Sequence, residues 1–301
     1  MDRRNFIRNS VAGAAVAGFG LGTVEAATIS AAAPFKLAYA PHFGMFENAA
    51  GKDEIAQLKF MAEQGFTALE DNGMRDRPVA LQEKIAAEMT RLGIRMGVFV
   101  VNGDTAWKPS LTTGDKALTE EFLKACRNSV EVAKRVNAKW MTVVPGFYTR
   151  SLSLDMQTAH VIDNLRRACE IFEPHGLVMV LEPLSDTPEL FLRYSEQTYM
   201  ICKAVNSPSC KILYDIYHMQ RNEGHLIPRI DSCWDEIAYI QIGDNPGRKE
   251  PTTGEINYKN IFKHIHGKGF TGVLGMEHGN SLPGKEGDLA VIKAYRESDS
   301  F

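Results

Sequence analysis

The chain lacks several features that would place it in a particular class of protein. It has only five cysteines in 301 residues and no Cys-x-x-Cys pair, which argues against a small disulfide scaffold and a structural zinc knuckle. It also lacks an excess of one charge, because 34 Lys and Arg stand against 37 Asp and Glu, for a formal net charge of −3. A nucleic-acid backbone is therefore not an expected partner. These absences favour an enzyme that acts on small molecules.

The N-terminal apolar run is too short to span a membrane. The uncharged run from Val11 to Val24 has 14 residues, whereas a spanning helix needs about 20. It follows Arg3-Arg4-Asn5-Phe6-Ile7-Arg8, a pattern typical of a twin-arginine export signal. We expect residues 1–33 to be this signal and a small-residue linker, with cleavage leaving a mature chain that begins between Ala27 and Pro34. The mature protein would then be periplasmic, exported in the folded state and without a membrane anchor. A basic N-terminus without a targeting role is the alternative.

The remaining residues, 34–301, alternate between short apolar runs and amphipathic stretches. The amphipathic stretches carry apolar residues at spacings of three and four, which predicts helices; they include 52–64, 80–92, 118–136, 156–173 and 194–205. The apolar runs predict eight strands at 35–39, 67–70, 95–101, 140–144, 177–181, 211–214, 237–242 and 271–276. Alternating strands and helices, at about 34 residues for each pair, are typical of a single-domain α/β protein with the (β/α)8 TIM-barrel fold.

Two further patterns support the barrel over an open, doubly wound sheet. Glycines stand between expected helix ends and the next strands, where they supply the left-handed conformation of a helix C-cap; they are Gly65, Gly93, Gly176 and Gly269. No Gly-x-Gly-x-x-Gly or Gly-x4-Gly-Lys-Ser/Thr motif follows the first expected strand. The doubly wound nucleotide-binding fold therefore loses its main support.

Each of the last four expected strands ends with an oxygen-bearing side chain. These residues are separated by 33, 26 and 36 positions, about one strand-helix unit each; they are Glu182, Asp215, Gln241 and Glu277. Since active sites of such barrels lie at the carboxyl ends of the strands, we expect the four side chains to converge. Three carboxylates and one amide oxygen form a hard ligand set, suited to Mg²⁺ or Mn²⁺.

The sequence around these residues resembles a known family. The segments that carry the resemblance are Leu213-Tyr-Asp-Ile-Tyr-His-Met-Gln-Arg221, Ile240-Gln-Ile-Gly-Asp-Asn-Pro-Gly-Arg248, Thr253-Gly-Glu-Ile-Asn-Tyr258 and Gly275-Met-Glu277. Together they resemble the hydroxypyruvate isomerase family, within the xylose-isomerase-like TIM-barrel superfamily. The resemblance is dense from residue 181 to residue 278 and thinner before it. Related ketose 3-epimerases usually have His in place of Gln241, which favours the isomerase branch.

The resemblance implies that Glu182 and Glu277 are both metal ligands and the catalytic acid/base pair. They would interconvert hydroxypyruvate and tartronate semialdehyde (2-hydroxy-3-oxopropanoate) by moving a proton through an enediolate, with a divalent metal stabilising the developing charge. It further implies that His218 contacts substrate oxygens. Arg248 would bind a substrate carboxylate or terminal hydroxyl. The alternatives are that His218 orients Asp215 or only packs, and that Arg248 is a surface loop cation.

Several alternatives concern the substrate and the class of protein. An export signal is unusual for an enzyme of central metabolism, so a periplasmic keto-sugar epimerase or isomerase with the same chemistry is the main alternative. Phosphodiester hydrolysis by a three-zinc cluster and a non-catalytic sugar-binding barrel are less favoured. The expected partner is a small hydroxy-carbonyl compound or sugar, and homo-oligomers occur among related barrels. The roles of His42, Trp107 and Glu255 stay open: the first two would wall the pocket, and the third would tie down its own loop.

Overall fold

The computed structural model describes residues 32–301. The expected export signal lies outside the described residues, except for Ala32 and Ala33 of its linker. No helix within 32–301 has the length and apolar character that crossing a membrane requires.

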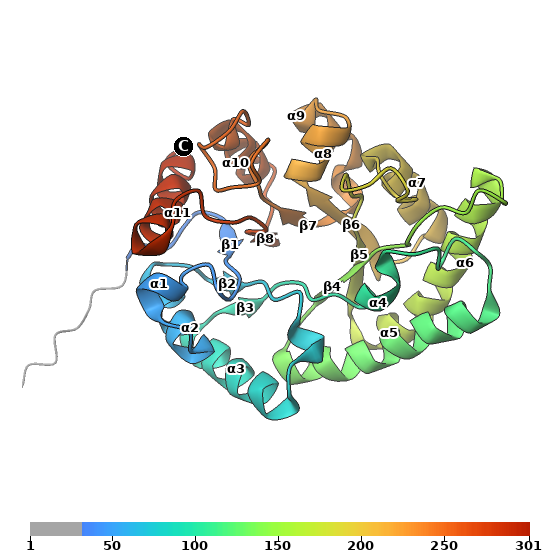
Figure 1. The fold of residues 1–301 in the computed structure, drawn as a ribbon, viewed down its shortest axis with the longest axis horizontal. Coiled ribbons are helices and arrows are strands. Elements are labelled where there is room, and N and C mark those ends of the chain that lie inside the picture. Colours follow the sequence, from blue (N-terminus) through green and yellow to red (C-terminus); the bar gives the residue numbers. More distant parts are fainter. Residues whose placement is uncertain (1–31) are drawn as a thin grey trace, which may run out of the picture. The chain divides into compact units, whose positions relative to one another are not determined.

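Eight parallel strands surround a common axis, as predicted (Figure 1). Six of them form one sheet in the order β1-β8-β7-β6-β5-β4, and β2 and β3 form a separate pair. Parallel bridges from His42 to Glu70 and from Val100 to Thr142 connect this pair to β1 and β4. The strands are β1 (Ala38–Ala40), β2 (Ala68–Leu69), β3 (Arg95–Met96), β4 (Trp140–Val143), β5 (Val178–Leu181), β6 (Cys210–Asp215), β7 (Ile237–Gln241) and β8 (Val273–Gly275).

Helices follow the strands and cover the outside of the sheet (Figure 1). The five predicted helical stretches correspond to α2 (Glu54–Glu63), α3 (Val79–Leu92), α5 (Lys116–Val136), α6 (Leu154–Phe172) and α7 (Ser195–Val205). The others are α1 (Glu47–Ala50), α4 (Gly103–Ala106), α8 (Ile216–Asn222), α9 (Leu226–Cys233), α10 (Tyr258–Gly267) and α11 (Gly284–Ser298). Short 3-10 turns are η1 (Met74–Asp76), η2 (Glu173–His175) and η3 (Trp234–Glu236).

Local sequence explains where these helices begin and end. Asp53, Asp115 and Ser153 cap α2, α5 and α6, because each side chain accepts a hydrogen bond from a backbone N–H of the first turn. The four predicted glycines all have positive φ, at 86°, 70°, 64° and 75° in chain order. The predicted role of these glycines in ending helices is confirmed.

One predicted strand is much shorter than expected. The apolar run from Arg95 to Val101 pairs with β2 only at Arg95 and Met96. After Gly97 the backbone changes partner: the N–H of Val98 donates to the hydroxyl of Tyr239 at 3.4 Å, and Val100 bridges to β4. The hydroxyl of Tyr239 thus accepts the hydrogen bond that the N–H of Val98 would donate to a neighbouring strand if β3 were longer.

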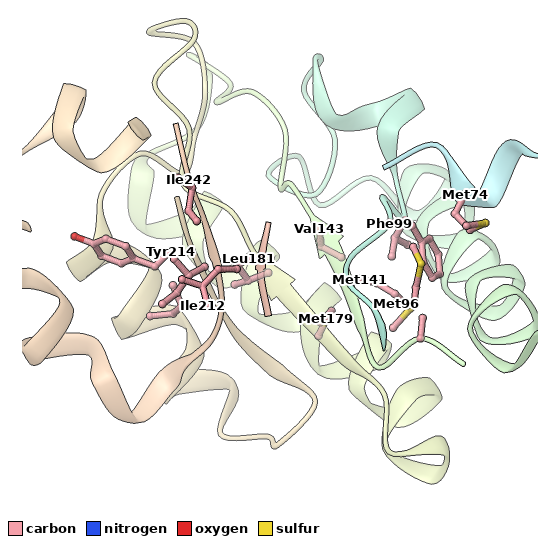
Figure 2. Close-up of a cluster of buried hydrophobic side chains, with 14 of the residues drawn as sticks. Met74, Met96, Phe99, Met141, Val143, Met179, Leu181, Ile212, Tyr214 and Ile242 are labelled. Carbon is pink, nitrogen blue, oxygen red and sulfur yellow. The ribbon is translucent and has the colours of Figure 1, made fainter. Parts of the chain in front are cut away.

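Side chains alternate between the two faces of the strands. Outward-facing residues pack against the helices in the main core, as Figure 2 shows for Met141 and Val143 of β4, Met179 and Leu181 of β5, Ile212 and Tyr214 of β6, and Ile242. The intervening residues form a second cluster inside the barrel: Ala40, Ala68, Val98, Val178, Val180, Leu213, Tyr239 and Val273. With a period of two, the next inward positions beyond this cluster are the strand ends. The alternation therefore directs the predicted site residues into the barrel mouth.

Candidate active site

The four predicted strand-end residues lie together at the carboxyl end of the barrel. Asp215 and Gln241 are direct partners in the ladder between β6 and β7, and Gln241 pairs with Gly275 of β8. Glu182 follows β5, and Glu277 lies two residues beyond Gly275. The register thus places Asp215 and Gln241 side by side, with Glu182 and Glu277 at the exits of the strands on either side.

The carboxylates lie close enough to bind one cation. One side-chain atom each of Glu182, Asp215, His218 and Glu277 lies within 4.8 Å of the others. Asp215 uses Oδ1 to accept the backbone N–H groups of Tyr217 and His218 at 2.7 and 3.1 Å, which caps α8. Its other oxygen, Oδ2, lies 3.3 Å from the guanidinium of Arg248 and 3.5 Å from Nε2 of His218.

His218 belongs to this cluster by distance, but its hydrogen bonds argue against a ligand role. The backbone N–H of Ser185 donates to Nδ1 of His218 at 3.2 Å, and a backbone N–H cannot accept. Nδ1 is therefore the acceptor, and Nε2 carries the proton of the neutral ring. Burial lowers the pKa of His218, opposed by the charge of Asp215. The buried Nε2–H has no hydrogen-bond partner among the described residues, which suits contact with a substrate oxygen.

Gln241 offers the fourth oxygen. Its amide nitrogen donates to Glu70 at 2.9 Å, while its buried carbonyl oxygen has no hydrogen-bond partner within the described chain. A buried carbonyl oxygen without a partner is unfavourable unless a ligand satisfies it. Together with three carboxylates, this donor set fits a hard divalent cation such as Mg²⁺ or Mn²⁺.

Arg248 lies within the cluster. Its guanidinium donates to a carboxylate oxygen of Glu277 at 2.5 Å and to Asp215 at 3.3 Å, and its Nε donates to the backbone carbonyl of Glu277 at 3.1 Å. Its backbone has φ of 49°, a left-handed conformation that is uncommon for a residue with a side chain. The guanidinium also lies over the ring of Tyr217, 5.0 Å from its centre. These contacts are those of a site residue rather than of a free surface cation.

Burial and mutual repulsion raise the pKa values of the two glutamates. For Glu182 the pKa lies well above its usual range, because the group is buried and the charges of Glu277 and Asp215 oppose its ionisation. Burial raises the pKa of Glu277 to about 8, with Arg248 lowering it and Glu70 raising it further. A raised pKa favours the protonated form of a carboxyl group, as a general acid requires.

A cavity of about 330 Å³ opens above these side chains. Glu182, His218, Arg248 and Glu277 line it, and Trp107 forms part of its wall, as expected. The other two undecided residues lie elsewhere. His42 directs its ring nitrogens to the carbonyls of Phe43 and His278. Glu255 accepts hydrogen bonds from Gln220 and Asn245 and so ties down its own loop.

Sequence reasoning missed two residues of β2 and its exit. The carboxylate of Glu70 accepts from the hydroxyl of Tyr239 at 2.7 Å as well as from Gln241, and Asn72 donates to Glu277 at 3.0 Å. Burial raises the pKa of Glu70 to about 7, opposed by these two hydrogen bonds. Glu70 stands at the end of a predicted strand, so the rule applied to the last four strands would have found it.

Comparison with known proteins places this site in a family. The model of the xylose isomerase-like TIM barrel matches residues 58–297. Hydroxypyruvate isomerase of Escherichia coli K12 is 34% identical over 161 residues, 53% of this chain and 62% of that protein. The 2-oxo-tetronate isomerase of Pectobacterium atrosepticum is 29% identical over 233 residues, 74% of this chain and 86% of that protein. The alignment spans about three fifths of the length of the Escherichia coli protein, and both relatives are isomerases by name.

A solved structure agrees with the fold. The crystal structure of an AP endonuclease, family 2, from Brucella melitensis superposes with a TM-score of 0.73, at 24% identity, over 85% of this chain and 98% of that one. At this identity the likeness concerns the fold alone. The match of the family model over most of the chain goes further, and the protein belongs to the xylose isomerase-like TIM barrel family.

Proposed function

We propose that the protein is a metal-dependent isomerase of small hydroxy-keto acids, which interconverts hydroxypyruvate and 2-hydroxy-3-oxopropanoate. One observation carries the proposal: two glutamates from β5 and β8, Glu182 and Glu277, meet at one small cavity, with Asp215 and Gln241 from the two strands between them. The identity to hydroxypyruvate isomerase and 2-oxo-tetronate isomerase supports the substrate class.

The proposed cation site consists of Glu182, Asp215, Gln241 and Glu277. When bound there, Mg²⁺ or Mn²⁺ supplies positive charge beside the two substrate oxygens that become negative during the reaction. A glutamate that also binds the cation stays basic only if its second oxygen is free, so at least one of the two binds through a single oxygen.

The two glutamates carry the proton transfer. One removes a proton from C3 of hydroxypyruvate to give an enediolate, and C2 then receives a proton from the opposite carboxyl group. The hydroxyl proton moves from the oxygen on C3 to the oxygen on C2, so that the aldehyde forms at C3. The raised pKa values of Glu182 and Glu277 suit groups that must both accept and return protons.

Two further residues would position the substrate. The Nε2–H of His218 has no partner among the residues described and donates to a substrate oxygen in this proposal. Arg248 binds the substrate carboxylate through its guanidinium, which lines the cavity.

The acidic mouth of the cavity favours a second candidate. Asp76, Asp104 and Asp186 line the cavity, and the nearby Arg75 is paired with the first two. An anionic substrate is repelled by such a mouth, whereas a neutral polyhydroxy ketone is not. A keto-sugar epimerase or isomerase with the same proton transfer is therefore the alternative.

The place of action and the assembly also belong to the proposal. The twin-arginine motif at Arg3 and Arg4 supports export of the folded protein to the periplasm, with no membrane anchor left after cleavage. Exposed apolar side chains on α6 and α7, among them Leu154, Met156 and Met200, are compatible with a homo-oligomer. The balanced charge supports small molecules over nucleic acid as partners.

The test is product formation by NMR. The Mn²⁺-loaded protein is incubated with hydroxypyruvate and, separately, with a panel of neutral ketoses. Formation of 2-hydroxy-3-oxopropanoate by the native protein, lost in Glu277→Gln and retained in Glu255→Gln, supports the proposal. Glu255 is a matched control, because it is a carboxylate held by its own loop outside the cavity. Conversion of a ketose alone moves the assignment to the second candidate, and no conversion of either class overturns both.

A further inference from the structure

A buried polar cluster lies inside the barrel beneath the cavity. It consists of Glu70 from the end of β2 and of Tyr239 and Gln241 from β7. All three side chains are buried, and Glu70 is only 2% exposed. The cluster is surrounded by the apolar residues of the inner layer, so its hydrogen bonds are shielded from water.

Two glycines make room for this cluster. A Cβ at Gly275 would lie 1.8 Å from a carboxylate oxygen of Glu70, and a Cβ at Gly97 would lie 2.4 Å from the hydroxyl oxygen of Tyr239. At distances this short, a side chain at either position would force Glu70 or Tyr239 to move. The two glycines thus leave space in the barrel wall for the carboxylate of Glu70 and the hydroxyl of Tyr239.

The carboxylate controls which way the amide of Gln241 faces. The amide nitrogen of Gln241 donates to a carboxylate oxygen of Glu70 at 2.9 Å, so Glu70 is the acceptor in this contact. A flipped amide would place two oxygens 2.9 Å apart, at the present nitrogen-oxygen distance. Tyr239 donates to the second oxygen of Glu70 at 2.7 Å. The carbonyl oxygen of Gln241 is left on the opposite side, without a partner among residues 32–301.

We infer that Glu70 is a positioning residue, which holds the carbonyl oxygen of Gln241 toward the cation site through its hydrogen bond to the amide nitrogen. The inference rests on the proposed cation site but not on the identity of the substrate. Hydrogen-bond partners behind metal ligands typically change metal affinity 10- to 100-fold when they are replaced. Glu70 is not a ligand, because both of its oxygens are already engaged within the barrel.

A rival explanation is that Glu70 acts only through its negative charge. Replacing Glu70 would then weaken cation binding whether or not Gln241 is present. If Glu70 acts by orienting the amide, its replacement has little effect once the amide has been removed. A double-mutant cycle between the two positions distinguishes the explanations.

The experiment measures the Kd for Mn²⁺ by electron paramagnetic resonance during titration with MnCl₂, without substrate. The proteins are the native chain, Glu70→Gln, Gln241→Ala and the double variant. We expect Glu70→Gln to raise the Kd about tenfold in the native background, and less than about threefold when Gln241 is already Ala. An equal effect in both backgrounds, or none in the native background, overturns the inference.

Tyr239→Phe provides the control for the fold. It removes the other hydrogen bond to Glu70 but leaves the bond to Gln241, and we expect its Kd for Mn²⁺ to stay within about threefold of the native value. A rise as large as that of Glu70→Gln would assign the effect to general loosening of the cluster and overturn the inference. A native protein that binds Mn²⁺ but isomerises no substrate overturns only the proposed function. A native protein that does not bind Mn²⁺ overturns both.

Discussion

The two halves of the barrel contribute differently to the site. Strands β5 to β8 deliver the proposed cation ligands, and β6 and β7 pair over several residues up to Asp215 and Gln241. In the first half, β2 and β3 pair at only two positions, and β2 and its exit supply Glu70 and Asn72, which hydrogen-bond to Gln241 and Glu277. The second half of the barrel, β5 to β8, thus supplies the side chains of the proposed cation site. The first half supplies hydrogen bonds that hold two of these side chains in place.

The alternation of inward- and outward-facing side chains places residues with two different roles inside the barrel. Glu70 and Gln241 both face the barrel interior, as the period-two pattern requires. What separates their roles is hydrogen bonding. Both oxygens of Glu70 are used inside the protein, whereas the oxygen of Gln241 has no partner among the described residues.

The largest expected effect is a loss of activity on substitution of Glu277, in the second half of the barrel. Glu277→Gln keeps the shape of the side chain but removes its ability to accept a proton, so we expect kcat for the isomerised substrate to fall about 10³-fold. Steady-state kinetics measure this effect, with circular dichroism to verify the fold. Activity within tenfold of the native protein would show that Glu277 is not half of the acid/base pair.

The next prediction concerns the close contact between β8 in the second half of the barrel and Glu70 in the first half. Gly275→Ala on β8 places a methyl group 1.8 Å from the carboxylate of Glu70, and such overpacking typically destabilises a protein by about 1–3 kcal/mol. Urea denaturation measures the loss. Gly267→Ala at the end of α10 is the matched control, because a Cβ there meets nothing within 4 Å and Gly267 is not among the positive-φ glycines. A native-like stability of Gly275→Ala would contradict the close packing between β8 and Glu70.

The pH dependence of stability tests the buried carboxyl groups as a set. In the metal-free protein, burial raises the pKa of Glu70 to about 7 and of Glu277 to about 8, from an ordinary value of 4.5. The folded protein then binds more protons than the unfolded one between these values. Its free energy of unfolding is highest below the ordinary value and falls as pH rises toward 8, by up to about 1.4 kcal/mol per pH unit for each group.

Added Mn²⁺ should reverse this trend, because the cation competes with protons for the same carboxylates and its affinity rises with pH. Thermal unfolding from pH 5 to 8, with and without MnCl₂, measures both trends. Glu277→Gln should show a shallower slope without metal. A metal-free stability that rises over this range would contradict the raised pKa values.

The smallest expected effect comes from the early half. Asn72→Ala removes the hydrogen bond to Glu277, which holds down the pKa of that carboxyl group. We expect a loss of activity of about tenfold and a shift of the acid limb of the pH-activity profile to higher pH. A pH-rate profile measures this shift, and an unchanged profile would show that Asn72 does not act through Glu277.

Much of this arrangement is predictable from the sequence. The eight apolar runs depend on local pattern, and each corresponds to a strand. The acidic or amide residues Glu182, Asp215, Gln241 and Glu277 follow from chain spacing, and they lie at or just beyond the ends of β5 to β8. Glu70 fits the same pattern and was overlooked. Other features depend on contacts between distant segments. The tautomer of His218 is set by a hydrogen bond from the backbone of Ser185. The hydrogen bond from Asn72 to Glu277 joins residues 205 positions apart. No local pattern encodes such pairs.

The separate pairing of β2 with β3 has a consequence for how the protein responds to heat. This pair joins the rest of the wall through isolated bridges, His42 to Glu70 on one side and Val100 to Thr142 on the other. Segments with few shared backbone hydrogen bonds open before the molecule unfolds as a whole. Since Glu70 lies at one of these bridges, local opening of the sheet there would break the hydrogen bond between Glu70 and the amide of Gln241 while the rest of the barrel stays folded. For the proposed cation-bound protein we therefore expect the cation to be lost early on warming, and hydrogen exchange at β2 should detect this opening before global unfolding begins.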